Sequence, residues 1–189
     1  MTKQALRSLY RTLRRELDPR EKMRMDALML LQFQQLDYAG ITTVLSYWPM
    51  PQEHEPDTHL FTRYLSHLFP GVQLAYPVTD PENDSMEAVA VSPSTRYPLN
   101  RWGIPEPATG SRIAPELIDL VLVPLLVCDH TGQRIGYGKG FYDRYLARCR
   151  PDVVKMGFCY FDPLAEKIPA GEFDVPLSYC ITPRHLYEF

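Results

Sequence analysis

Two patterns of apolar residues follow one another along this chain. In the first, apolar residues recur with the period of a helix. In the second, they form the short continuous run of a buried strand. The helical period predicts helices over residues 3–17, 19–38 and 58–69, and a fourth that begins at residue 141. The short apolar runs predict strands over residues 41–47, 72–78, 86–91, 119–128, 153–160 and 179–182. Strands that alternate with helices favour a parallel sheet covered on both faces. Residues 1–189 are therefore predicted to form a single α/β domain, a three-layer α/β/α, Rossmann-like fold with a mostly parallel central sheet.

The most apolar run, Leu120–Val127, leads into a glycine-rich loop and then into the fourth helix. Three glycines alternate over residues 136–140, so the backbone can approach a ligand closely, and the first N–H groups of the next helix remain unpaired. Lys139 adds a positive charge, and Asp143 supplies an oxygen suited to Mg²⁺. The loop matches neither the Walker A sequence nor the Rossmann fingerprint, which requires glycine where Phe141 stands. The residues alone therefore predict an anion site, with a tight packing turn as the alternative.

The first predicted helix is amphipathic and basic. Its polar surface carries five cations: Lys3, Arg7, Arg11, Arg14 and Arg15. Lys3 and Arg7 are four positions apart and therefore neighbours on one face, able to hold the same polyanion. The spacing alone favours a solvated charged surface over a polyanion-binding site.

Two loops add candidate binding residues. The segment after the strand at 41–47 offers Met50 as an apolar wall and Glu55 as a carboxylate. Its acids and histidines, residues 53–59, match no established metal-ligand spacing, so we do not expect a metal there. Trp102 lies in a long Pro-rich region over residues 79–118, where it would either stack on a flat ligand ring or anchor the loop.

An acidic residue, Asp174, precedes the last predicted strand and is either a second Mg²⁺ contact or a turn residue.

Composition narrows the class of protein. The chain has 189 residues, 45% of them hydrophobic, and a net charge of −3. That composition is globular, and that charge provides no general attraction for nucleic acid. No apolar run approaches the length that spans a bilayer, and no signal-peptide core is present. We expect a cytoplasmic monomer that binds neither nucleic acid nor membranes, with four scattered, reduced cysteines.

Four segments together resemble the 5-formyltetrahydrofolate cyclo-ligase (methenyltetrahydrofolate synthetase) family. They are residues 3–7, 102–107, 134–143 and 174–177. The resemblance spans essentially the whole chain. It implies an ATP- and Mg²⁺-dependent ligase that forms a C–N bond, converting 5-formyltetrahydrofolate to 5,10-methenyltetrahydrofolate with release of ADP and phosphate. The γ-phosphoryl group would be transferred to the formyl oxygen, and the folate N10 would then attack the activated carbon.

The resemblance also implies roles for individual residues. Lys139 and Arg134 would be catalytic, and Asp143 and Asp174 would hold Mg²⁺. The small-molecule partners would be ATP and the folate. ATP would contact Lys3, Gln4, Ala5, Leu6, Arg7, Arg134, Ile135, Gly136, Tyr137, Gly138, Lys139, Gly140, Phe141 and Tyr142. The folate would contact Met50, Glu55, Trp102, Tyr137, Gly138, Lys139, Gly140 and Phe141.

Two alternatives accompany this interpretation. One is an inactive relative that binds folate or nucleotide as a regulatory or storage module. The other, which rests on fold analogy alone, is a sugar-phosphate isomerase or acyl-CoA transferase, which would require a catalytic Glu and no ATP.

Overall fold

A mixed sheet organises the computed structural model, which describes residues 1–80 and 82–189. Its eight strands are arranged in the order β10-β9-β8-β5-β1-β2-β3-β4. The five strands from β9 to β2 run parallel, and β10, β3 and β4 are antiparallel to their neighbours. The strands are β1 (Thr43–Leu45), β2 (Gln73–Asp80), β3 (Ser85–Ala90), β4 (Arg112–Ile113), β5 (Leu120–Val123), β8 (Val154–Phe158), β9 (Tyr179–Ile181) and β10 (Leu186–Glu188). The prediction of an α/β fold with a mostly parallel sheet is confirmed.

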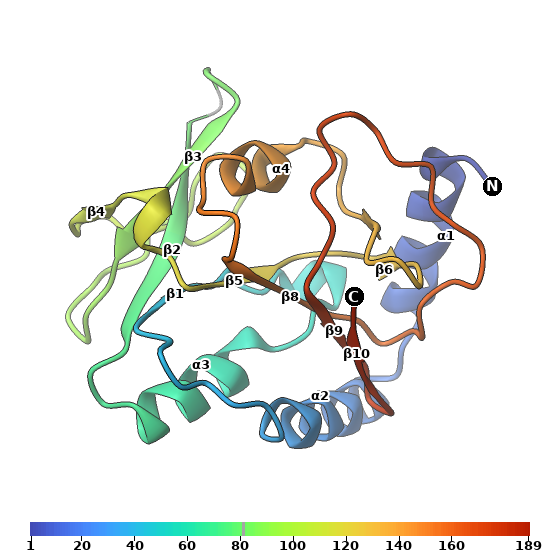
Figure 1. Cartoon of the computed structure of the whole chain (residues 1–189), viewed down its shortest axis with the longest axis horizontal. Helices are drawn as coiled ribbons and strands as arrows, with labels where there is room; N and C mark the ends of the chain where they lie inside the picture. The colour runs from blue at the N-terminus through green and yellow to red at the C-terminus, as the bar shows by residue number, and fades with distance from the viewer. Residues whose placement is uncertain (81) are drawn as a thin grey trace.

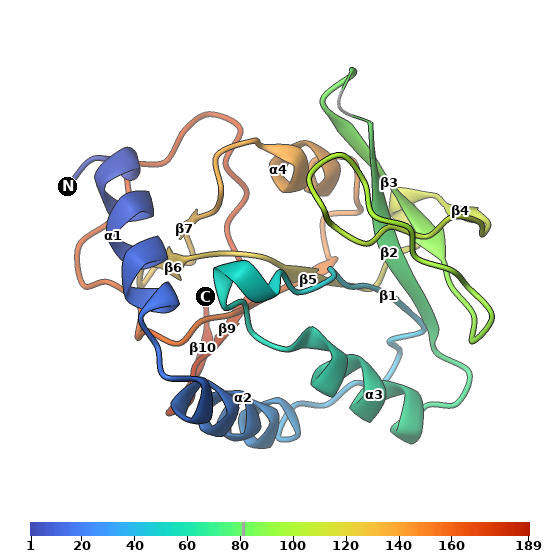
Figure 2. The same ribbon diagram turned by 180° about the vertical axis from the view of Figure 1, so that it is seen from behind.

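Helices lie on both faces of this sheet (Figures 1 and 2). Helices α2 (Pro19–Phe33) and α3 (Thr58–Leu68) cover one face, and α4 (Phe141–Leu146) covers the other. Helix α1 (Lys3–Arg15) lies at one end of the molecule, beside a small hairpin of β6 (Val127–Cys128) and β7 (Arg134–Ile135). Side chains cap the first turns of α1 and α2, since Thr2 accepts from Ala5 N and Asp18 accepts from Arg20 N.

The core divides according to the alternation of side chains along the strands. On β5, Leu120 and Leu122 belong to the cluster under α2 and α3, whereas Val121 and Val123 belong to the cluster under α4. All four are almost completely buried. A strand buried on both faces reads as a continuous apolar run, which explains why the sequence signal was strongest here.

The second helix ends five residues earlier than predicted, at Phe33 rather than near Tyr38. The apolar pattern continues beyond Phe33 because Tyr38 folds back onto the helix end. Its hydroxyl donates to the Phe33 carbonyl at 2.6 Å, and the two rings lie 4.8 Å apart. Tyr38 thus adds a short hydrogen bond to a helix-end carbonyl that otherwise accepts only from Leu36 N at 3.4 Å among the described residues, without itself being helical.

The strand predicted over residues 119–128 is also wrong in its second half. Pro124 follows β5 directly and has no N–H to continue the ladder. The chain then leaves the sheet, and Leu126 N donates to Ile135 O at 2.7 Å at the start of the β6–β7 hairpin. The short strands β4, β7 and β10 were not predicted, because their two or three residues do not belong to a longer apolar run, and β6 lies inside the strand predicted over residues 119–128.

The direction in which successive strands are added to the sheet reverses between β1 and β5. From β1, the chain crosses to β2 on one side, while β5 pairs with the opposite side of β1. Such reversal points are where open α/β sheets bind ligands. The loops that follow these two strands, residues 46–57 and 124–140, therefore begin side by side. Within residues 1–80 and 82–189, no helix has the length and apolar character needed to cross a membrane.

Candidate functional site

The N-terminal half of α1 lies against the glycine-rich loop. Arg7 Nε donates to the Gly136 carbonyl at 2.9 Å, and Arg7 also donates to Gln4 Oε1 at 2.7 Å. A Cβ placed on Gly138 would lie 3.0 Å from the Arg7 guanidinium carbon, and Gly138 has a φ of +88°. Glycine is therefore needed at this position both for its backbone conformation and for the close approach of α1. The two segments with predicted phosphate contacts, far apart in sequence, are neighbours in space.

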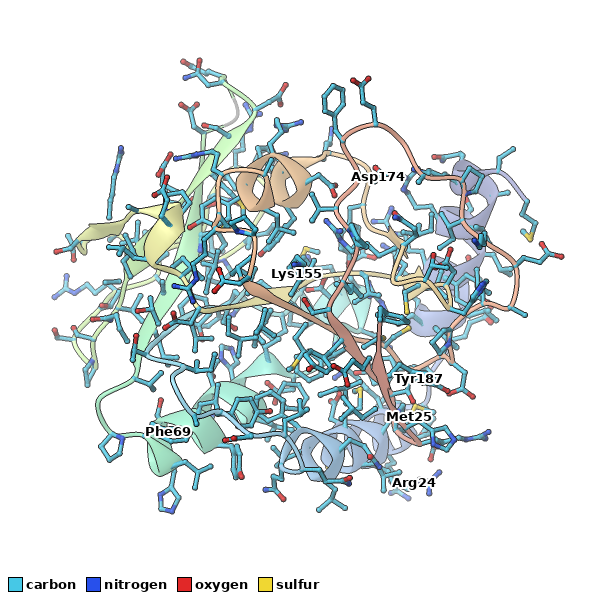
Figure 3. The ribbon with its side chains drawn as sticks, viewed as in Figure 1. Arg24, Met25, Phe69, Lys155, Asp174 and Tyr187 are labelled. Atoms are coloured by element: carbon cyan, nitrogen blue, oxygen red, sulfur yellow. The ribbon has the colours of Figure 1, made fainter. Side chains whose placement is uncertain are left out.

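One ion pair joins α1 to the loop that precedes β9, and a second joins β7 to α4. Lys3 pairs with Asp174, and Arg134 pairs with Asp143 at 2.8 Å. Arg134 also donates to the Val175 carbonyl, and Val175 N donates to Asp143 Oδ1 at 3.1 Å. Figure 3 shows Asp174 on the segment that passes between α4 and α1. Each predicted metal ligand is thus paired with a cation that was predicted to contact ATP.

The two carboxylates fit a magnesium site of the kind that substrate phosphates complete. Mg²⁺ is commonly held by one or two carboxylates together with phosphate oxygens and waters. Asp143 and Asp174 are 26% and 31% exposed, so their free oxygens can reach a ligand. Burial opposes ionisation of Asp174, but Lys3 and the Gly171 N–H lower the pKa of its carboxyl overall. No cluster of three or more candidate metal-binding side chains occurs in the part of the chain that the structure describes.

Glu55 lies on the other side of the glycine loop and is only 3% exposed. Its Oε2 accepts from Met50 N at 2.7 Å, and its Oε1 accepts from the Tyr137 hydroxyl at 2.7 Å. Burial raises the pKa of the Glu55 carboxyl, although the Tyr137 hydrogen bond, the nearby Arg14 and the Met50 N–H act in the opposite direction. Three predicted folate contacts, Met50, Glu55 and Tyr137, are therefore brought together.

Trp102 reaches the same loop from the long connection before β5. Its ring contacts Phe141 edge to face, with the centroids 6.2 Å apart, and Arg101 lies over its other surface at 4.5 Å. The side chain remains 40% exposed, so the structure places it at the surface rather than in the core. Lys139, between Tyr137 and Phe141 in the loop, is exposed and forms no ion pair with any described residue.

Some predicted contact residues direct their side chains away from solvent. Leu6 and Ile135 pack together in a small core cluster, and any ligand contact they make must come from the backbone.

The other predicted contact residues differ in exposure. Ala5 is exposed on the first turn of α1. Gly140 begins α4 with a φ of +71°, and the Tyr142 hydroxyl is buried without a hydrogen-bond partner among the described residues.

Arg14 corrects the prediction of a solvated basic face. It is 2% exposed and donates to the Glu53 carbonyl at 2.7 Å, to the Leu125 carbonyl at 2.9 Å and to the Tyr137 hydroxyl. Glu53, also buried, accepts from Arg11 and Arg15. No local signal separates Arg14 from the other cations, because Arg11 lies four positions from Arg7 on the same side of the helix and its side chain is still 45% exposed.

A family model described as the 5-formyltetrahydrofolate cyclo-ligase family matches residues 1–183. The 5-formyltetrahydrofolate cyclo-ligase of Escherichia coli K12 is 29% identical over 182 residues, covering 89% of this chain and 99% of that protein. The mouse 5-formyltetrahydrofolate cyclo-ligase is 33% identical over 102 residues, covering 50% of this chain and 48% of that protein.

Solved structures show the same fold. The 5,10-methenyltetrahydrofolate synthetase of Aquifex aeolicus superposes with a TM-score of 0.82 at 28% identity, covering all of this chain and 93% of that one. A 5,10-methenyltetrahydrofolate synthetase from Mycoplasma pneumoniae superposes with a TM-score of 0.75 at 24% identity, covering 97% of this chain and 99% of that one.

Proposed function

This chain belongs to the 5-formyltetrahydrofolate cyclo-ligase family, and we propose that it converts 5-formyltetrahydrofolate to 5,10-methenyltetrahydrofolate with hydrolysis of ATP to ADP and phosphate. One observation carries the proposal. Cations from α1 and from the glycine loop converge on the two carboxylates Asp143 and Asp174, beside a loop that also contacts Glu55. A nucleotide site and a folate site would therefore share the segment over residues 137–141.

The reaction requires activation of a formamide. Its carbonyl carbon is a weak electrophile, and its oxygen is a poor leaving group. Transfer of the γ-phosphoryl group to that oxygen releases ADP. Attack by N10 on the activated carbon then forms the second C–N bond, the oxygen departs with the phosphate, and N10 loses its proton. Such a transfer depends on positioning and charge neutralisation more than on covalent chemistry by the protein.

The ion pairs suggest how the protein would receive the phosphates. Lys3 and Arg134 each pair with a carboxylate that belongs to the proposed magnesium site. When nucleotide binds, Lys3, which is about one-third exposed, would turn from Asp174 to a phosphate oxygen, whereas Arg134, which is 6% exposed and also donates to the Val175 carbonyl, would stay beside Asp143. Asp143 and Asp174 would hold Mg²⁺, which would neutralise charge on the phosphates. Asp174 would thus gain a metal as it loses Lys3, and its charge would remain balanced.

Lys139 is the residue best placed to follow the transferring group. Its side chain is exposed on the loop between the two proposed ligands and has no ion-pair partner among the described residues. The glycines on either side, Gly138 and Gly140, both have positive φ, which keeps the loop backbone close to α1 and to the start of α4. We propose that Lys139 and Arg134 stabilise charge on the phosphoryl group during transfer.

The folate would occupy the opposite side of the loop. Glu55 provides an acceptor for the donor edge of a pterin ring, Met50 an apolar wall, and Trp102 an aromatic surface. Phe141 contacts Trp102 and is the first residue of α4, the helix that follows the glycine loop. The nucleotide and the folate would therefore be held by one continuous segment.

The direct test follows methenyl absorbance when purified protein is mixed with 5-formyltetrahydrofolate, ATP and Mg²⁺. We expect product to form with one ADP released per turnover, and no product without ATP. Folate binding with no absorbance change at micromolar protein would contradict the proposal and favour the inactive, ligand-binding relative.

Replacing Asp143 with Asn tests the proposed metal site. The amide keeps the shape of the side chain but loses the charge, so the Mg²⁺ concentration for half-maximal rate should rise by about tenfold. Titration of Mg²⁺ at saturating ATP and folate measures it, with Asp152→Asn on the surface after α4 as the matched control. An unchanged Mg²⁺ titration for Asp143→Asn would make Asp143 a structural partner of Arg134 only.

A further inference from the structure

The Tyr137 hydroxyl connects residues from three separate parts of the chain. It accepts a hydrogen bond from Arg14 of α1 and donates one to Glu55, in the loop after β1, at 2.7 Å. We infer that Tyr137 is a positioning residue that fixes the Glu55 carboxylate for folate recognition and ties it to the position of the glycine loop. The inference rests on the function proposed above, and it gives this side chain a role that the family resemblance does not specify.

The hydrogen-bonding capacities of the three side chains match. A phenol has one donor, which Tyr137 gives to Glu55, and it accepts from Arg14. A carboxylate offers about four acceptor positions, of which the Tyr137 hydroxyl and Met50 N use one on each oxygen. The remaining positions are free for the donors of a ligand. Glu55 is therefore held by both oxygens without being saturated.

The position of the Glu55 carboxylate depends on its hydrogen bond from Tyr137, and through Tyr137 on Arg14. Burial leaves the carboxylate no water to replace a lost partner. Glu55 is 3% exposed, and Arg14 is 2% exposed. Arg14 is itself fixed by the carbonyls of Glu53 and Leu125, so it provides a rigid anchor. A hydrogen bond removed from such a network leaves its partners buried and unpaired.

The surroundings also determine whether Glu55 is ionised. Five groups face it: Arg14 from α1, Glu53 from the turn at residues 51–53, Tyr47 from the end of β1, Tyr142 from α4, and Tyr137. Burial raises the pKa of Glu55, whereas the Tyr137 hydrogen bond and Arg14 lower it. Burial and Glu55 together raise the pKa of Tyr137, so this phenol remains a donor.

The experiment measures binding of 5-formyltetrahydrofolate by calorimetry without ATP, at about pH 6 and pH 8.5, so that it does not depend on turnover. The proteins are the wild type, Tyr137→Phe, Glu55→Gln and the double variant. Tyr179→Phe is the matched control, because among residues 1–80 and 82–189 its hydroxyl bonds only to Glu188, on the distant edge of the sheet. ATP binding is measured on the same proteins.

Loss of the hydroxyl removes a donor from the ionised carboxylate, so the pKa of Glu55 should rise further. Folate binding by Tyr137→Phe should therefore weaken by about tenfold at pH 6 and by about twofold at pH 8.5. In the Glu55→Gln background the same change should have almost no effect, because Tyr137 acts through that carboxylate.

Three outcomes would overturn the inference: equal weakening at both pH values, equal weakening with and without the Glu55→Gln substitution, or a loss confined to ATP. If circular dichroism shows that Tyr137→Phe does not fold, the wild type and Glu55→Gln are compared instead. Identical pH dependence of folate binding in these two proteins would overturn the inference. Failure of the wild type to bind folate at all would contradict the proposed function itself.

Discussion

The two halves of α1 both carry basic residues, but these side chains differ in exposure and in the groups to which they donate. In the N-terminal half, Lys3 pairs with Asp174, and both side chains are about one-third exposed. In the C-terminal half, Arg14 is buried and donates to two backbone carbonyls. We propose that the first pairing exchanges its partner for a ligand. The second cannot be released without leaving buried carbonyls unpaired.

This difference shows why a basic helical face cannot be interpreted by its charge alone. One helix provides both an anchor at Arg14 and a proposed ligand-binding end at Lys3, separated by about three turns. The anchor holds the loop segment at Leu125 and the turn at Glu53 in place, and the N-terminal half then meets the glycine loop at Gly136. The end proposed to bind a ligand is thus positioned by the structural end.

The largest effect is expected from Arg14→Met. The variant leaves the Glu53 and Leu125 carbonyls without a donor, so the free energy of unfolding should fall by about 3 kcal/mol. Urea denaturation followed by circular dichroism measures it. Arg24→Met is the matched control, since Arg24 pairs with Glu21 on the exposed surface of α2 and its replacement should leave the midpoint unchanged. Equal midpoints for both variants would remove the distinction between the two halves.

Lys139→Ala should have the opposite effects, a large loss of turnover and little loss of stability. Turnover should fall by about 100-fold because a phosphate contact strengthens as charge moves in the transition state. Folate binding and the urea midpoint should stay close to those of the wild type, because Lys139 is exposed. Steady-state rates and calorimetry separate these quantities, with Lys167→Ala as the control on a different exposed loop. Parallel loss of folate binding and turnover would contradict a role confined to the phosphoryl group.

Glu53→Gln tests the anchored half through its pH dependence. Burial opposes ionisation of Glu53, but hydrogen bonds from Arg11 and Arg15 lower the pKa of its carboxyl overall. A lowered folded-state pKa contributes stability above the unfolded value of about 4.3, and that stability disappears as pH falls through the folded value. The variant should be less stable by about 2 kcal/mol at pH 7 and should match the wild type near pH 3. A constant difference across unfolding measurements from pH 7 to pH 3 would exclude this contribution.

The smallest effect on stability is expected from Lys3→Met, which removes a partly exposed ion pair. The free energy of unfolding should change by about 0.5 kcal/mol. ATP binding should weaken while folate binding is kept, which calorimetry with each ligand measures. A stability loss as large as that of Arg14→Met would mean that both halves of α1 are structural.

The sequence predicted the parts of this molecule whose signals are local. The apolar run into Pro124, the cap at Asp18 and the glycines at 136–140 each impose their structure within a few residues. Several of the predicted site residues are brought together, since α1, Met50, Glu55 and Trp102 all meet the loop over residues 136–141 directly or through Tyr137. Their ligand roles remain predictions.

What could not be predicted depends on contacts between distant segments. Nothing local distinguishes Arg14 from Arg11, because burial of Arg14 results from how α1 docks on the loops after β1 and β5. The end of α2 was misplaced because Tyr38 has the periodicity of a helix and instead caps its last turn. Strands of two or three residues form only because a partner strand is already present.

The ion pair between Lys3 and Asp174 joins residues that are 171 positions apart. At about 5–20 residues per second, a ribosome takes roughly ten to thirty seconds to add the residues between them. Contacts this far apart in the chain form late, because the entropy of closing so long a segment must be overcome first. The four helices and strands β1 to β8 precede Asp174 and can begin to assemble before then, whereas β9, β10 and the proposed nucleotide site are complete only after almost the whole chain has been made.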